Sequence, residues 1–105
     1  MTTEIETLVA EVKQATDYQI NKRILKEKIK TDLHLVYKNG MFLVTPELLA
    51  FTATWPDNIF YLADVYENPV EIIKEEFLQL ARMHYHTVMN TWHQQHEELK
   101  RIRKV

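Results

Sequence analysis

The segment Ile29–Thr45, IKTDLHLVYKNGMFLVT, decides the fold, because it contains the strongest turn signal in the chain. Apolar and polar residues alternate from Ile29 to Tyr37, which is the pattern of a half-buried strand. Asn39-Gly40 separates this run from Phe42–Thr45, and this dipeptide favours a tight turn whose two central residues have positive φ. We therefore predict an antiparallel hairpin with Asn39-Gly40 at its turn.

A helix is predicted before this hairpin. Thr3 and Glu6 have the spacing of a capping box, in which each side chain accepts a hydrogen bond from the other residue's backbone N–H. Apolar or small residues then follow at helical spacing, at Ile5, Leu8, Val9, Val12 and Thr16, with Glu4, Glu6 and Glu11 outside this stripe. The pattern drifts at Ile20 and Ile24, so we expect the helix either to continue to about Lys26 or to kink near Asp17.

Two further elements are predicted after the hairpin. Thr45 caps a short helix with Pro46 at its first position, where the missing N–H is harmless, and Trp55-Pro56 ends it. Residues 58–72 fit either a helix or a second hairpin. The turn-forming residues 67–69 favour the hairpin.

The C-terminal helix is predicted to be the longest element. It begins at Pro69 if Asn68 caps it, and otherwise near Lys74. Its apolar face comprises Ile73, Phe77, Leu80, Ala81, His84, Val88, Trp92, Leu99 and Ile102. Roughly 30 residues would extend about 45 Å, so we expect its last turns, from about His93, to project beyond the rest of the molecule.

Composition limits the fold and the chemistry. A chain of 105 residues with 46% hydrophobic and 27% charged residues is typical of one folded domain, here residues 1–105. It has one glycine, no serine and no cysteine, so the commonest nucleophiles and the glycine-rich phosphate loops are absent. We predict a single, mostly helical α+β domain, with long terminal helices packed on a hairpin or meander and a short middle helix. We expect no catalytic residue and no cofactor.

The end of the C-terminal helix is a candidate partner interface. Trp92, Leu99 and Ile102 form an apolar strip that the expected projection would leave uncovered, and Tyr85 widens this face on one flank. Exposed apolar strips usually mark interfaces. The strip would contact either the same helix of another subunit or the first helix of its own chain.

Two basic clusters are candidates for binding nucleic acid. They comprise Lys22, Arg23, Lys26, Lys28 and Lys30, and Lys100, Arg101, Arg103 and Lys104. If the ends of the two long helices lie together, the clusters would form one patch able to contact phosphates. The overall charge of −2 favours solubility and helix-end chemistry instead.

Histidines and carboxylates are expected to be structural. His86, His93 and Glu97 share one stripe of the last helix, but a zinc site needs three or four converging ligands, so no metal is predicted. His84 lies within the apolar face and is expected to be a hydrogen-bonded core histidine. Asp57, Asp64 and Glu67 flank predicted turns and are expected to be structural.

Several motifs are similar to those of small proteins of unknown function from myovirus-type tailed phages. They are Asn39–Phe42, Thr45–Leu48, Tyr66–Pro69, Glu76–Leu78, Tyr85 and Met89–Trp92, within roughly residues 30–103. These motifs are turns, caps and core aromatics, so they indicate a fold and do not indicate an activity. The resemblance implies a phage origin, and hence a virion component, an assembly factor or a host-modulating protein.

The sequence therefore favours a non-enzymatic structural or protein–protein interaction module that is oligomeric. Its partner would be a second copy or another phage or host protein, in the host cytoplasm or the virion. No apolar run is long enough to cross a membrane, and the first residues do not resemble a signal peptide, so a soluble intracellular protein is expected. The alternative is a nucleic-acid-associated accessory protein that uses the two basic clusters.

Overall fold

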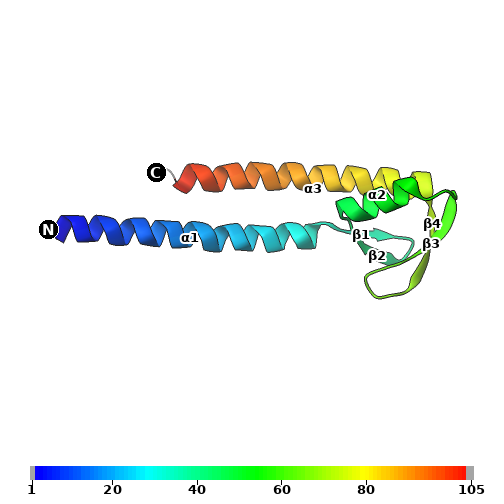
Figure 1. Ribbon diagram of the computed structural model, residues 1–105, viewed down its shortest axis with the longest axis horizontal. Coiled ribbons are helices and arrows are strands. Elements are labelled where there is room, and N and C mark those ends of the chain that lie inside the picture. The colour runs from blue at the N-terminus through cyan, green and yellow to red at the C-terminus, as the bar shows by residue number, and fades with distance from the viewer. Residues whose placement is uncertain (1, 104–105) are drawn as a thin grey trace.

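The computed structural model describes the backbone of residues 2–103 and the side chains of residues 4–102. Its elements, in chain order, are α1 (Thr2–Asp32), β1 (His34–Tyr37), β2 (Gly40–Leu43), α2 (Pro46–Thr54), β3 (Ile59–Ala63), β4 (Pro69–Ile73) and α3 (Lys74–Arg103). The molecule measures 70 × 23 × 20 Å. A small α+β head lies at one end, and an arm of two antiparallel helices, α1 and α3, extends from it (Figure 1). The predicted fold class is thus confirmed.

The head contains the larger core. Two separate antiparallel hairpins, β1–β2 and β3–β4, pack with α2 against the first turns of α3. Phe77 of α3 is fully buried between the rings of Tyr37 and Phe42. Both rings contact it edge-on, with their centroids 5.1 and 5.2 Å from the centroid of Phe77. Edge-on pairs of this kind add to the stabilisation from apolar burial.

The second hairpin was the favoured interpretation of residues 58–72, and it is confirmed. Val70 and Ile72 of β4 point into the core and pair with Leu62 and Phe60 of β3. Because Pro69 begins this strand, α3 begins at Lys74, and the alternative start at Pro69 is wrong. Burial of the two inward-facing residues, Val70 and Ile72, favours the strand over the helix that a cap at Asn68 would begin.

The short helix α2 begins and ends as predicted. Thr45 has extended backbone, with φ −124° and ψ 160°, and its Oγ1 accepts a hydrogen bond from the Leu48 N–H at 3.1 Å. Pro46 occupies the first turn, where no N–H is needed. Trp55 follows the last helical residue, Thr54.

The turn of the first hairpin is displaced by one residue from the predicted position. Tyr37 pairs with Gly40, so the two turn residues are Lys38 and Asn39, whose φ angles are 46° and 67°. Gly40 belongs to β2 and its φ is not positive. A Cβ on Gly40 would lie only 2.6 Å from Cγ2 of Val70, so any larger residue here would require β4, which packs directly on it, to shift.

Asp64 fastens the two hairpins together. One of its carboxylate oxygens accepts hydrogen bonds from the N–H groups of Tyr66 and Asn68, at 3.0 and 2.9 Å. The other accepts from the Met41 N–H at 3.2 Å, and the Met41 carbonyl accepts from the Val65 N–H. These backbone donors, that of Asn68 first, lower the pKa of Asp64. The expected structural role of Asp64 is confirmed.

The arm corrects two predictions about the first helix. α1 continues to Asp32, so the expected end near Lys26 and the expected strand from Ile29 are both wrong. Leu25, Ile29 and Leu33 are spaced four residues apart and pack against Val88 of α3. This shared face is buried only if the segment is helical, which explains why the period-two pattern does not prevail.

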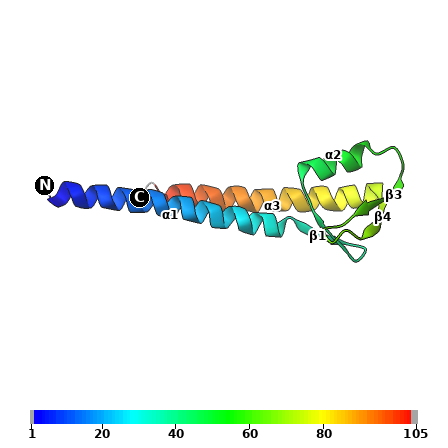
Figure 2. The ribbon, with the colours of Figure 1, turned by 60° about the horizontal axis from the view of Figure 1, so that its bottom comes forward.

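The start of α1 projects at the free end of the arm, whereas the last turns of the C-terminal helix were expected to project. The Nε2 atom of His84 lies 2.7 Å from the carbonyl oxygen of Asp32, which fixes the two helices side by side. From that contact, Arg103 stands 19 residues further along α3, and Lys13 stands 19 residues back along α1. With an equal rise per residue, α3 ends about level with Lys13. Residues 2–12, here called the overhang, therefore lie beyond α3, as Figures 1 and 2 show.

Candidate interaction surface

A groove runs along the arm between α1 and α3. It encloses about 750 Å³ and is lined by Gln19, Lys22, Arg23, Lys26, Glu27, Ile29, Lys30, Leu33, Met89, Trp92 and His96. Its floor is apolar, with Ile29 from α1, Leu33 directly after that helix, and Met89 and Trp92 from α3. The buried residues of the arm, Leu25, Ile29 and Val88, lie along the same stretch of the two helices as the groove.

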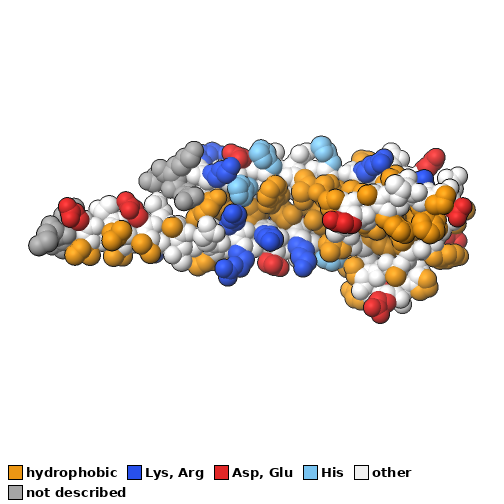
Figure 3. All heavy atoms as spheres, viewed as in Figure 1, with side chains coloured by type: hydrophobic (Ala, Val, Ile, Leu, Met, Phe, Trp, Pro, Cys, Tyr) orange, Lys and Arg blue, Asp and Glu red, His pale blue; other side chains and the backbone are white. Residues whose placement is uncertain are grey.

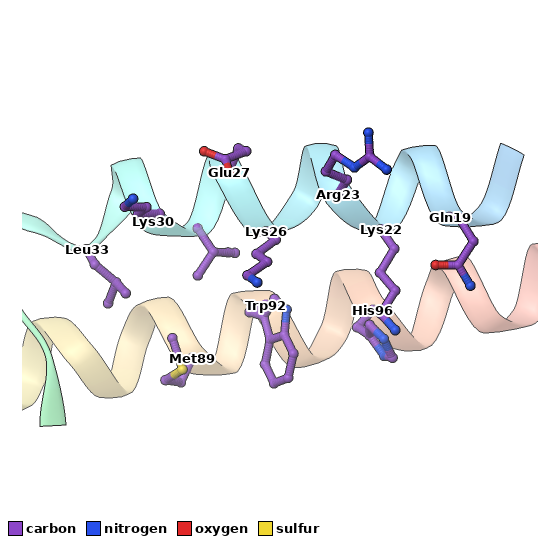
Figure 4. A pocket seen from close by; sticks show the side chains of 11 residues that line it. Gln19, Lys22, Arg23, Lys26, Glu27, Lys30, Leu33, Met89, Trp92 and His96 are labelled. Atoms are coloured by element: carbon purple, nitrogen blue, oxygen red, sulfur yellow. The ribbon is translucent and has the colours of Figure 1, made fainter. Parts of the chain in front are cut away.

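One wall of the groove is basic. Lys22 and Lys26 extend from α1 towards His96 and Trp92 of α3, whereas Arg23 points away from α3 (Figure 4). Lysine side chains in this position cover apolar surface with their methylene groups and keep the ammonium in solvent. The groove therefore combines an apolar floor with a positive rim.

The basic residues of this wall form no ion pair with any side chain that the structure describes. Among the residues with described side chains, the ion pairs are Lys38–Glu71 at 3.4 Å and Lys100–Glu97 at 3.3 Å. None of the basic residues between positions 22 and 30 takes part in either. The basic groups of the wall are therefore available to pair with an acidic surface of another molecule.

The second basic cluster lies apart from the first. Measured from the contact between His84 and Asp32, Lys100 is about level with Thr16, which is about two helical turns from Lys22 at the near end of the groove's basic wall. Lys100 is also paired with Glu97, and its hydrogen bond and charge lower the pKa of that carboxyl group. Arg103 and Lys104 belong to the predicted cluster, but their side chains lie outside the described residues.

The residues predicted for the partner interface divide into two pairs. Trp92 is 39% exposed and stands in the groove, with its ring 5.5 Å from that of His96, and Ile102 is exposed near the end of α3. Leu99 is half-buried on the arm, packed towards α1, and Tyr85 is half-buried against the head. The first helix thus covers part of the strip, which was one of the two expected partners.

The histidine stripe forms no metal centre in the part of the chain that is described. His86 contacts Asn90 one turn on, at 3.2 Å, and no three metal-binding side chains converge there. His84 is half-buried rather than in the core, and it is hydrogen-bonded to Asp32, as anticipated for a structural histidine.

The overhang carries a surface that sequence reasoning assigned to internal packing. Its apolar residues Ile5, Leu8, Val9 and Val12, here called the N-terminal stripe, are between 59% and 62% exposed. Figure 3 shows apolar side chains along one side of this end, with acidic ones beside them and basic ones further along the arm. The signal for this arrangement is in the sequence: acids at Glu4, Glu6 and Glu11, and bases between 22 and 30.

No protein-family model, curated protein or solved structure matches the chain. In the described part, no helix is long and apolar enough to cross a membrane.

Proposed function

We propose that the protein is a non-enzymatic interaction module whose two-helix arm binds a helix of a partner protein. The observation that carries the proposal is the exposure of the N-terminal stripe. Four apolar side chains at positions 5, 8, 9 and 12 lie on one side of the overhang, the part of α1 that no other described element of the chain covers.

Helix energetics support this function. Most helical stability in proteins comes from packing an apolar face, and a helical segment of about 12 residues is marginal in water by itself. A partner that buried the N-terminal stripe would gain apolar burial at about 25 cal/mol per Å² and would stabilise the overhang as a helix. The groove beside Trp92 offers a second place for such a contact.

A nucleic-acid-associated function is the second candidate, and the unpaired basic wall of the groove favours it. Binding to phosphates would weaken steeply with salt, because each contact releases a counterion. The net charge of −2 and the three acids of the overhang speak for a protein partner instead. The phage origin, with action in the virion or the host cytoplasm, stays a prediction.

Site-specific photo-crosslinking in the cells that make the protein tests the function. A photoreactive residue replaces Val12 on the stripe or, as the matched control, Asp17 on the other side of α1. We expect protein adducts, of this chain or another, at position 12 and few at position 17. Equal yields at both positions, or adducts that nuclease removes, would contradict a protein-binding stripe.

A further inference from the structure

We infer, on the basis of the proposed function, that the partner is a second copy of this chain. Two α1 helices would lie antiparallel, and the N-terminal stripe of each copy would occupy the groove between α1 and α3 of the other. The juxtaposition that supports this pairing is a match of face, charge and length between the overhang and the groove.

The stripe and the groove wall lie on the same face of α1. Arg23, Lys26, Glu27 and Lys30 follow Ile5, Leu8, Val9 and Val12 by 18 residues each. At 3.6 residues per turn, 18 residues make about five full turns, so each pair points in the same direction from the helix axis. A helix laid along this one face meets apolar side chains at one end and the basic groove at the other.

The charges of these two ends are complementary. The overhang carries Glu4, Glu6 and Glu11 beside its stripe and no basic residue. The groove carries four basic residues on its α1 side, Lys22, Arg23, Lys26 and Lys30, against one acid, Glu27. A parallel pair would place acid beside acid and base beside base, so charge selects the antiparallel orientation.

Two copies are sufficient to form a closed, symmetric pair. A two-fold axis near the middle of α1 would place the overhang of each chain opposite residues 22–32 of the other, so the same contact forms twice. The overhang is about 16 Å long, and the groove wall from Gln19 to Leu33 is about 21 Å long, so the first fits within the second.

The floor of the groove offers suitable contacts for an amphipathic helix. The side chains of Met89 and Trp92 would contact the incoming apolar residues, and the stems of Lys22 and Lys26 would enclose them. Binding of an amphipathic helix in an apolar groove, with residues spaced three and four apart as anchors, is a recurrent mode of recognition. Exposed tryptophan in such a place is a frequent centre of binding energy.

Complementary charge reversal tests the pairing. One full-length variant carries Glu6→Lys and Glu11→Lys in the overhang, and a second carries Lys22→Glu and Lys26→Glu in the groove. Glu4 is retained because an acid in the first turn stabilises the helix. The matched controls are Asp17→Lys and Lys28→Glu, which are exposed and do not line the groove.

We expect the wild type and both controls to be dimers by light scattering. Each reversed variant alone should dissociate at least about tenfold more readily, because like charges then face each other in the groove. An equimolar mixture of the two variants should restore the dimer, since each overhang then meets a groove of opposite charge. Circular dichroism checks that every variant keeps its helices.

Three results would overturn the inference. The first is a monomeric wild type, the second a dimer that the reversals leave unchanged, and the third a mixture that stays as weak as its components. None of these decides the proposed function, which depends on the crosslinks at Val12 and holds for a different partner protein.

Discussion

Gly40 and Val70 come from different hairpins, and their contact determines how closely the two sheets approach. A Cβ at position 40 would lie 2.6 Å from Cγ2 of Val70, 3.2 Å from the ring of Phe42 and 3.3 Å from the Tyr37 carbonyl. The one glycine of the chain is therefore required by packing between hairpins, and the left-handed turn positions are occupied by Lys38 and Asn39.

Gly40→Ala should destabilise the head by about 1–3 kcal/mol, the usual cost of overpacking a close contact. In a Val70→Ala background the added methyl has room, so the same change should cost clearly less. Urea unfolding of the four proteins in this double-mutant cycle measures the coupling. If Gly40→Ala lowers the free energy of unfolding equally in both backgrounds, the glycine is needed for its backbone conformation and not for the contact with Val70.

His84→Ala should weaken the junction between the arm and the head. The imidazole caps the last turn of α1 through the Asp32 carbonyl oxygen at 2.7 Å, and a hydrogen bond of this kind contributes about 1 kcal/mol. Thermal or urea unfolding measures the change. His86→Ala is the matched control, because that side chain contacts only the neighbouring turn at Asn90, and a loss of equal size there would argue against the cap.

Asp64 should make stability depend on acid pH. Its pKa is lowered below the ordinary value of 3.8 in the folded protein, so its stabilising effect is complete above about pH 4–5. The effect is lost as the pH falls through the folded-state pKa, where the carboxylate must be protonated. Asp64→Asn should be less stable at pH 7 and lose less stability between pH 5 and pH 3 than the wild type. Parallel slopes for the two proteins would contradict this role.

Local signals predicted the head well because each has a mechanism that operates over a few residues. Thr45 and Pro46 fix the start of α2 wherever the helix packs. The turn-forming residues 67–69 and the alternation on either side specify a hairpin. The displaced turn at Lys38 and Asn39 was not predictable in this way, because the constraint on Gly40 comes from Val70, which is distant in sequence.

The arm was predicted less well because its boundaries depend on tertiary contacts. The alternation from Ile29 to Tyr37 fits a strand, and only the packing of Leu25 and Ile29 against α3 shows that the helix continues. The spacing of Leu8 and Val12 predicts one helical face correctly, but the position of this face beyond the end of α3 depends on how the two long helices pair.

Hydrogen exchange of the overhang in the purified protein tests the central claim, that a second copy covers the N-terminal stripe. We predict that the amides of residues 6–12 are protected at high protein concentration. Their protection should decrease on dilution and in Leu8→Asp/Val12→Asp, while the amides of residues 84–92 in α3 remain protected as the internal reference. If residues 6–12 exchange as fast as an unstructured chain at every concentration while α3 stays protected, no second copy covers the stripe and the claim is wrong.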